Sequence, residues 1–390
     1  MNRYLRFDKL NRKNAATESE FWSHFFAVEP DPNRHQIAPS IDAGYLRKLL
    51  HESRSELELS QDSNFMVALD GLEPIARISM NRSLHDQSLG YFGCFDYSIY
   101  TSRATESAPI AGAAAAMREL LKKSEKWFVQ NGISRIIGPV CLSTWFPYRL
   151  QTEEYTGHIF SWEPRTPVEY SEMLQDRGFR ADFRYSSFCV ENLSAIEASL
   201  RNYETNALRD GFVFKTLHTS EIPKNIETLH KLTIDTFQGK FLFEPIPLRA
   251  FARLYLSGQS LNQAQISVDL VYAPGGEAIG FMLSHIEEGH IVLKTMGILR
   301  PFRRGGLAFA LAARAIRLGL ANQCSRLVGA LLYADGKSMN WWNELTQPGK
   351  PLWEHKYSLF YKELSNDHHK KLTKGFMADT QPVTFTGVPQ

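Results

Sequence analysis

The sequence predicts an α/β protein made of two tandem domains, each with a mixed, mostly antiparallel sheet flanked by helices. Three observations support this fold class. Short apolar runs of strand length alternate with longer runs that have helical spacing. The same order of elements (hairpin, strand, helix, strand, helix, strand) occurs twice along the chain. Its 390 residues suffice for two domains of ordinary size. Helices on both faces of each sheet would bury a core in each domain.

The first copy is predicted within residues 1–195. Residues 1–60 are polar and are expected to be mostly helical, with apolar side chains at helical spacing in 45–57. Two strands within 64–83 are joined by the turn Asp70-Gly71. The remaining elements are a strand at 89–95, a helix at 112–130, a strand at 135–140, a helix at 168–177 and a strand at 183–190.

The second copy is predicted within residues 196–365, after a linker near 193–210. Its strands and helices repeat the order of the first copy. They are a strand at 212–217, helices at 222–237 and 248–256, a hairpin at 266–285, a strand at 291–298, a helix at 307–320, a strand at 327–333, a helix at 337–345 and a closing strand at 357–364. Residues 366–390 are polar and contain proline, which predicts a loose tail.

The composition excludes several classes of protein. A net charge of +2 gives no reason to expect nucleic acid or an anionic membrane as a partner. We expect no membrane span, because no apolar run reaches about 18 residues, and no export signal, because the N-terminus lacks an apolar core. The cysteines are widely spaced and form no CxxC pair, which predicts neither a metal site nor a disulfide framework: Cys94, Cys141, Cys189 and Cys324. A cytoplasmic protein with reduced thiols is the simplest interpretation.

A basic glycine turn is the most informative motif. Arg303-Arg304-Gly305-Gly306-Leu307-Ala308 lies between the predicted strand 291–298 and the predicted helix 307–320. Free N–H groups and the helix dipole favour an anion at a helix N-terminus. Glycine lets a phosphate approach the backbone, and arginine adds charged donors. The turn is neither a Walker loop nor a dinucleotide fingerprint, because both spacings are absent.

The spacing Arg303-x-x-Gly306-x-Ala308 resembles the R/Q-x-x-G-x-G/A signature of the GNAT acyltransferase superfamily. Ile298 precedes Arg303 by five residues, as in the family's V-x-P-x-x-R spacing, whereas Pro301 stands one place later than usual. The resemblance implies that this loop holds the pyrophosphate of coenzyme A. The predicted coenzyme-binding residues are Met296, Gly297, Ile298, Arg303, Arg304, Gly305, Gly306, Leu307 and Ala308.

In this family the strand before the loop has a second role. The resemblance implies that backbone N–H groups around Met296 to Ile298 pair with the pantetheine arm, and that one of them polarises the thioester carbonyl. Backbone donors aimed at a developing oxyanion contribute strongly to catalysis. The next strand, 327–333, would separate from it and open the slot for pantetheine.

The general acid and base are less clearly marked. The family often supplies the acid from a tyrosine within N-x-x-A-x-x-x-Y, and the matching position here is Trp342, which cannot protonate a thiolate. Tyr333, at the end of the preceding strand, is the predicted substitute, and Tyr357 is a second candidate. The candidate bases are carboxylates and histidines, any of which can equally be a solvated or structural group: Glu287, Glu288, His290, His158 and Glu163.

The N-terminal half lacks the cradle spacing, so we expect no second coenzyme A site there. Its segment 138–149, GPVCLSTWFPYR, combines hydroxyls, aromatic faces and a guanidinium after a strand end. One interpretation is an acceptor-binding loop in which Trp145 and Tyr148 contact the substrate and Arg149 pairs with its carboxylate or phosphate. The alternative is a proline-turned loop whose Trp and Tyr fill the domain interface, with Arg149 in a structural ion pair.

The sequence therefore predicts an acyl-CoA-dependent N-acyltransferase that moves an acyl group, most simply acetyl, to an amine of a small molecule. Acetyl-CoA or another acyl-CoA would be the co-substrate, and no metal would be needed. Three alternatives stay open at this point. They are an acyl donor bound to an acyl carrier protein, a tandem GNAT-like ligase that uses aminoacyl-tRNA, and a non-catalytic protein that binds acyl-CoA.

Overall fold

The computed structural model describes residues 3–8, 15–28, 63–98, 112–256, 265–303, 305–334, 336–346 and 350–364. These residues belong to two compact units made of interleaved segments. Unit 1 draws on residues 1–152, 164–183 and 358–377, and unit 2 on residues 153–163, 184–357 and 378–390. Two long strands, β7 (Arg180–Val190) and β13 (Trp353–Glu363), each contribute to both units. The domain ranges 1–195 and 196–365 stay a prediction.

Unit 1 contains one parallel pair of strands in an otherwise antiparallel sheet. The strand order is β1 (Arg3–Asp8), β2 (Ser63–Asp70), β3 (Glu73–Arg82), β4 (Leu89–Tyr97), β5 (Arg135–Gly138) and β13, with β4 and β5 parallel. A two-residue strand, β6 (Leu150–Gln151), pairs with β13. The helices are α1 (Ala15–Phe26), α3 (Ala113–Gln130) and α4 (Val168–Asp176). Because parallel strands need a crossover, α3 connects β4 to β5 and buries Met117, Leu120 and Phe128 in the core.

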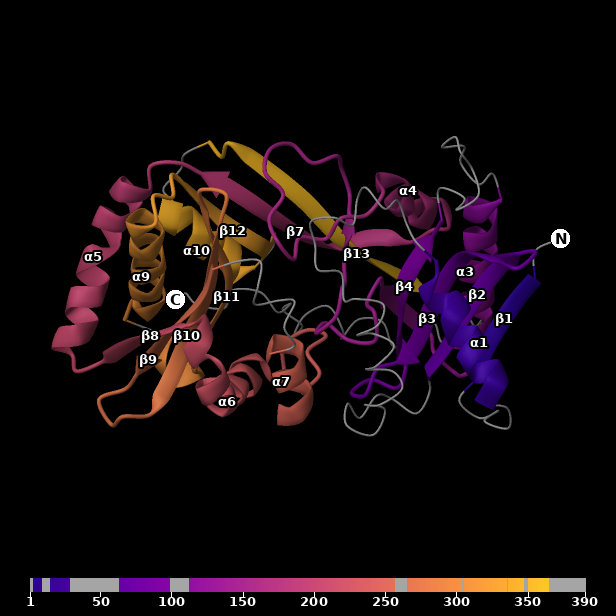
Figure 1. Cartoon of the computed structure of the whole chain (residues 1–390), viewed down its shortest axis with the longest axis horizontal. Coiled ribbons are helices and arrows are strands. Elements are labelled where there is room, and N and C mark those ends of the chain that lie inside the picture. Colours follow the sequence, from indigo (N-terminus) through magenta and orange to yellow (C-terminus); the bar gives the residue numbers. More distant parts are fainter. Residues whose placement is uncertain are drawn as a thin grey trace. The chain divides into compact units, whose positions relative to one another are not determined.

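Unit 2 repeats this plan. Its strand order is β8 (Val213–His218), β9 (Gln265–Tyr272), β10 (Ala278–Glu287), β11 (His290–Ile298), β12 (Arg326–Tyr333) and β7, with β11 and β12 parallel. The helices are α5 (Leu193–Arg209), α6 (Ile226–Phe237), α7 (Leu248–Leu256), α9 (Leu307–Ala321) and α10 (Lys337–Thr346). The apolar helix α9 is the crossover from β11 to β12, and α5 lies alongside it (Figure 1).

The predicted fold class and the repeated order of elements are confirmed. The N-terminal region needs one correction, because residues 3–8 form β1 rather than a helix and pair with β2. The six residues RYLRFD show no regular alternation of polar and apolar side chains, so no period-two signal marks this strand in the sequence. The predicted linker at 193–210 is the helix α5, and β13 begins at Trp353 rather than Tyr357. The predicted helix at 45–57 and the tail 366–390 lie outside the described residues.

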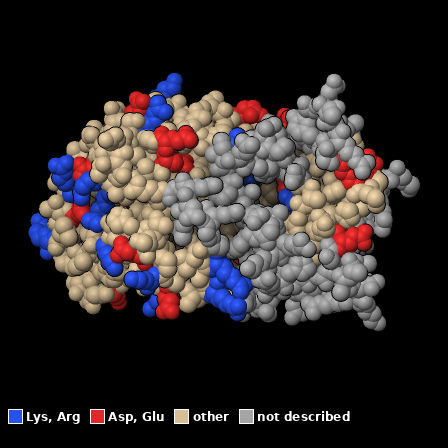
Figure 2. All heavy atoms as spheres, in the orientation of Figure 1, with Lys and Arg blue, Asp and Glu red and all other residues tan. Residues whose placement is uncertain are grey.

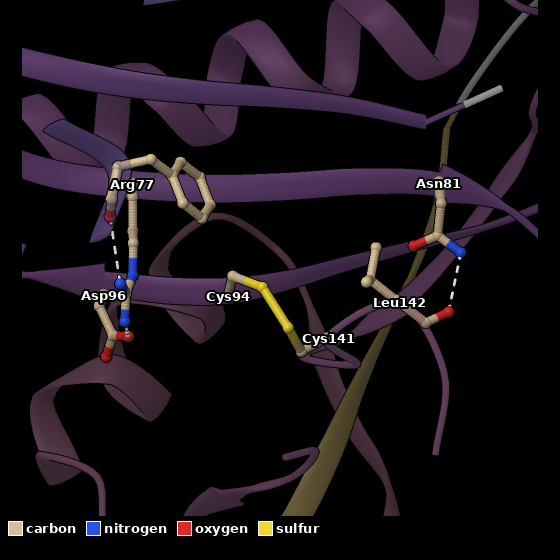
Figure 3. The surroundings of a disulfide bond; sticks show 7 residues. Arg77, Asn81, Cys94, Asp96, Cys141 and Leu142 are labelled. Carbon is tan, nitrogen blue, oxygen red and sulfur yellow. Dashed lines mark hydrogen bonds and ion pairs between the residues drawn. A yellow bond between two sulfur atoms is a disulfide. The ribbon is translucent and has the colours of Figure 1, made fainter. Parts of the chain in front are cut away.

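The expectation of reduced thiols without a disulfide is wrong. Cys94 and Cys141, which are 47 residues apart in sequence, form a disulfide in unit 1 (Figure 3). The parallel pairing of β4 with β5 brings the two segments together, and the Val140 amide donates to the Phe92 carbonyl just before the bridge. Spacing along the sequence carries no sign of this contact. Cys189 and Cys324 are buried free thiols.

The surface carries charges of both signs. Lys and Arg alternate with Asp and Glu over the visible face of unit 2 (Figure 2), in keeping with the small net charge of +2. Among the described residues, no helix combines the length and the apolar character that a membrane crossing requires.

Candidate functional site

The strands β11 and β12 stop pairing halfway along their length. Their parallel register runs from His290 opposite Arg326 to Leu293 opposite Gly329 and ends there. At this level β11 has a bulge, because its register against β10 skips Lys294. β-bulges bend a strand and are common next to active sites. The expected separation of these two strands is therefore confirmed.

A second bulge lies in β12 at the same level. The register of β12 against β7 shifts between Gly329 and Leu332. Leu331 within this bulge has φ = 57°, in the left-handed region that a leucine rarely adopts. Both partners of the parallel pair thus bend away from regular geometry just beyond their last contact.

Beyond the bulge, the last residues of β11 pair only with β10. Met296 lies opposite Met282, Gly297 opposite Phe281 and Ile298 opposite Gly280. In the described part of the sheet, no strand pairs with the other edge of this stretch. Its backbone groups are the ones that sequence reasoning assigns to a pantetheine arm.

The glycine turn forms the start of α9 as predicted. Gly306 is the N-cap residue with φ = 79°, Gly305 has φ = 94°, and no side chain caps the helix. A Cβ on Gly306 would lie 2.2 Å from Cδ1 of Tyr203, so this position requires glycine for space as well as for conformation. The first-turn amides of a helix have no acceptor within the helix. The turn therefore offers N–H donors and the positive end of the helix dipole.

The Arg303 side chain connects the glycine turn to two neighbouring elements through hydrogen bonds. Its Nε donates to the Ile298 carbonyl at 2.9 Å and its Nη2 to the Thr236 carbonyl at 3.3 Å. Burial and the neighbouring Arg300 lower the pKa of Arg303. The side chain thus joins the end of β11 to the end of α6 and keeps a cation beside the start of α9. Arg304 lies outside the described residues.

Sequence reasoning missed three further cations near this turn. Lys240 follows α6, Arg300 lies in the short 3₁₀ helix η3 (Arg300–Phe302), and Lys337 begins α10. Burial together with Arg303, Lys337 and Arg300 lowers the pKa of Lys240 to about 8. This repulsion indicates that several positive charges gather beside Lys240. In the sequence each of these cations is a single basic residue at or next to a different helix, so no motif marks the three together.

Thr236 is a second residue that the sequence did not single out. Its side chain is 1% exposed, and its hydroxyl has no hydrogen-bond partner among the described residues. A Cβ on Gly297 would lie 2.8 Å from Cγ2 and 3.2 Å from Oγ1 of Thr236. The hydroxyl therefore lies against the part of β11 that β12 leaves unpaired. An unsatisfied buried hydroxyl is unusual and marks a place where a ligand atom or a water can bind.

The two candidate acids occupy different surroundings. Tyr333 is half-buried at the end of β12, with its ring edge-to-face on Tyr185 at 5.3 Å. Trp342, at the family's tyrosine position, is 3% exposed and packs over Gly329 and Phe188. Tyr357 is 1% exposed, and burial raises its pKa well above the usual value. Of the two tyrosines, only Tyr333 has part of its side chain accessible.

Most of the candidate bases form a cluster at the opposite end of β11 from Gly297. His158 lies 3.3 Å from both Glu287 and Glu288, and its ring stacks on His290 with centroids 4.1 Å apart. Burial raises the pKa of Glu287, but hydrogen bonds from His158 and the Ser161 amide, together with the His285 ring 3.6 Å away, outweigh it and hold this pKa well below the usual range. A base works best with a pKa near the operating pH. This cluster therefore suits a structural role.

In unit 1 the chain segments stay in contact at the position that corresponds to the strand separation of unit 2. Beyond the last β4–β5 pair, the Val140 amide still donates to Phe92, and a Cβ on Gly93 would lie 2.1 Å from the Val140 carbonyl oxygen. The Cys94–Cys141 bridge ties β4 to the segment after β5, and Asn81 in β3 donates to the Leu142 carbonyl of that segment (Figure 3). The absence of a coenzyme site from unit 1 stays a prediction.

The proposed acceptor loop of unit 1 is tightly folded. Arg149 is 3% exposed, has φ = 81°, and its guanidinium carbon lies 3.9 Å from the centroid of the Tyr148 ring. Its amide donates to the Pro139 carbonyl, which closes the loop. Trp145 is half-buried. Contact of these three side chains with an acceptor stays a prediction.

Comparison with solved structures identifies the fold. No family model matches the sequence, and no curated protein matches it. A tandem GNAT protein from the clavulanic acid biosynthesis pathway aligns with 94% of this chain and 99% of its own, with a TM-score of 0.50 and 9% identity. A probable N-acyltransferase from Enterococcus faecalis covers 93% and 73%, with a TM-score of 0.49 and 11% identity. A GCN5-related N-acetyltransferase from Sphaerobacter thermophilus covers 93% and 96%, with a TM-score of 0.42 and 11% identity.

The first of these similarities extends over nearly the whole of both chains. It agrees with the repeated order of elements, with one parallel strand pair per unit, and with the crossover helices α3 and α9. The chain has the fold of a tandem GNAT protein.

Proposed function

We propose that unit 2 is an acyl-CoA-dependent N-acyltransferase site that moves an acyl group, most simply acetyl, to an amine of a small molecule. One observation carries this proposal. The parallel strands β11 and β12 separate at two facing bulges, and the separation leads to the uncapped N-terminus of α9. A thioester on a long flexible arm with a diphosphate at its far end matches both features. The similar tandem GNAT structure is described as solved without AcCoA, which agrees with such a ligand for the fold.

The coenzyme's phosphates would bind at the glycine turn. The amides from Gly305 to Ala308 supply N–H donors, and Gly306 leaves room for a close approach. Lys240, Arg300 and Lys337 add positive charge beside Arg303. These cations favour complete coenzyme A over an arm attached to a carrier protein, because the carrier-bound arm lacks the nucleotide phosphates.

The acyl group would lie beside the unpaired edge of β11. A backbone N–H from Met296, Gly297 or Ile298 would stabilise the negative charge that develops on the thioester oxygen. The amine nitrogen attacks the carbonyl carbon, a C–N bond forms and the C–S bond breaks. The amine gives up one proton to solvent or a base, and the leaving thiolate takes one proton, which we assign to the Tyr333 hydroxyl. The acceptor role of Trp145, Tyr148 and Arg149 belongs to the same proposal.

Thermal unfolding with and without ligand tests the donor site. Acetyl-CoA should raise the Tm of the wild-type protein, because a ligand of the native state stabilises it. Gly306→Ala should abolish the shift, since its Cβ meets Tyr203. Gly276→Ala is the matched control. Gly276 has φ = 83°, close to the 79° of Gly306, but a Cβ there meets nothing within 4 Å.

The two variants separate backbone strain from loss of the site. Gly276→Ala should lower the Tm of the free protein and keep the shift with acetyl-CoA. Absence of a shift in the wild-type protein with any acyl-CoA refutes the proposed donor. Thiol release from acetyl-CoA in the presence of a panel of small amines then distinguishes a transferase from a binding protein.

A further inference from the structure

A buried network of hydrogen bonds runs through unit 2 to the bulge in β12. Leu331, in its left-handed conformation, donates its amide to the Ser187 hydroxyl at 2.8 Å instead of to a strand carbonyl. Such a conformation costs free energy for leucine and persists only where the surroundings hold it. Ser187 is fully buried, so its side chain is the partner that holds this amide.

The direction of each bond in the network follows from the chemistry of its members. Tyr357 donates its hydroxyl hydrogen to Glu163 Oε1. The tyrosine has no second hydrogen, so the Ser187 hydroxyl, 3.1 Å away, donates to the Tyr357 oxygen. The Ser187 oxygen then accepts the hydrogen bond from the Leu331 amide. The hydroxyls of Tyr357 and Ser187 therefore each donate one hydrogen bond and accept one.

The other end of the network, at Glu163 and His355, is also held by hydrogen bonds. Glu163 Oε1 lies 2.8 Å from His355 Nδ1, and the Phe160 amide donates to Glu163 Oε2 at 3.2 Å. His355 Nε2 donates to the Thr156 carbonyl at 2.6 Å, since a carbonyl offers no hydrogen. The His355 ring is stacked between Tyr155 and Trp353. Neither Glu163 nor His355 has more than 1% exposure.

The network ends where the candidate site begins. The last parallel pair of β11 and β12 is Leu293 with Gly329, and Leu331 follows two positions later in β12. A regular Leu331 would let β12 continue beside β11 and close the separation. Holding Leu331 in the left-handed region therefore keeps the strands apart.

We propose that Ser187, Tyr357, Glu163 and His355 form a positioning network that holds the bulge at Leu331 and so keeps open the space for the pantetheine arm. The inference rests on the proposed acyl-CoA site and adds residues that lie outside the glycine turn. These side chains act through Leu331 and do not touch the ligand. Loss of the network should weaken the binding of the arm and leave the binding of the nucleotide unchanged.

Ser187→Ala tests whether the network supports the binding of the pantetheine arm but not that of the nucleotide. It removes the acceptor of the Leu331 amide and leaves a buried donor unpaired. The variant should bind acetyl-CoA about tenfold more weakly or worse. It should bind adenosine 3′-phosphate 5′-diphosphate, the nucleotide half of the coenzyme, within about twofold of wild type, because that half occupies the turn at α9. Isothermal titration calorimetry measures the two dissociation constants, with a displacement titration for the ligand that binds more weakly.

The control is Ser186→Ala in the same strand. Ser186 donates to Glu354 at 2.8 Å and has no bond to the network, so this variant should bind both ligands like wild type. If Ser187→Ala does not fold, Tyr357→Phe replaces it, with Tyr361→Phe as control, because Tyr361 bonds only Glu363 among the described residues. Tyr357→Phe should show the same selective loss.

A double variant tests the role of Leu331 directly. Glycine adopts the left-handed region without support, so Ser187→Ala should weaken acetyl-CoA binding much less in a Leu331→Gly background than in wild type. Equal weakening of acetyl-CoA and of its nucleotide half, or unchanged binding of both, would overturn the inference. A wild-type protein that binds neither ligand refutes the proposed site itself, and the inference with it.

Discussion

If unit 2 binds acetyl-CoA as proposed, Lys240 should make that binding depend on pH. Burial and the cations Arg303, Lys337 and Arg300 lower its pKa from 10.5 to about 8 in the free protein. A bound diphosphate brings negative charge and favours the ammonium form. Binding should therefore take up protons at pH 8, where about half of Lys240 is neutral.

The size of the effect follows from that pKa. If Lys240 is fully protonated in the complex, uptake on binding is about 0.1 proton at pH 7, about 0.5 at pH 8 and about 0.9 at pH 9. The affinity then falls about tenfold from pH 7 to pH 9. The sign is fixed, because the pKa is lower in the free protein. Affinity is nearly complete at pH 7 and is lost as the pH rises through about 8.

Calorimetry in buffers of different ionisation enthalpy measures the uptake. Acetyl-CoA is the right ligand, because it has no free thiol that titrates in this range. Lys240→Met should abolish the proton uptake and flatten the pH dependence. Lys215→Met in β8, where the lysine is exposed, should leave both unchanged. The reasoning fails if wild type takes up no proton at pH 8, or if Lys240→Met retains the full uptake.

Three further predictions concern the reaction and the stability. Tyr333→Phe should lower kcat by roughly a hundredfold or more at unchanged acetyl-CoA affinity, as loss of a general acid does; a kcat within a few-fold of wild type would remove Tyr333 from that role. His158→Gln should lower the Tm more at pH 6 than at pH 8. A hydrogen bond to Glu287 raises the pKa of His158, so its stabilisation is present below the unfolded pKa and is lost as the pH rises through the folded pKa. An equal loss of Tm at both pH values would contradict this linkage. Cys94→Ser with Cys141→Ser should lower the free energy of unfolding in urea by about 4 kcal/mol, from closure of a loop with a sequence separation of 47; a reductant should reproduce the loss in wild type, and no change would show that the bridge is absent in solution.

Local patterns of the sequence were enough for most of the fold. The hairpin at Gly71, the end of α3 at Gly132 and the start of α9 at Gly306 are marked by glycines that adopt left-handed φ. Helical and strand periods give the elements between them. The exchange of β7 and β13 between units has no local signal, because each strand looks the same whichever sheet it joins.

The candidate site was only partly predictable. The glycine turn and the end of β11 are contiguous in sequence, so a motif shows them. Thr236 lies in α6, Lys240 follows that helix and Ser187 lies in β7, and only the fold brings them to β11, β12 or α9. The same holds for Cys94 and Cys141, which meet through the pairing of β4 with β5. Contacts of this kind depend on tertiary packing and leave no periodic trace.

The central claim is that the unpaired end of β11 and the first turn of α9 together hold an acyl-CoA. Amide hydrogen exchange with and without acetyl-CoA measures this directly. Peptides that cover Met296 to Ile298 and Gly305 to Ala308 should exchange more slowly with the ligand, whereas those that cover β4 and β5 should not change. Unchanged exchange in both unit 2 segments at saturating acetyl-CoA would contradict the account.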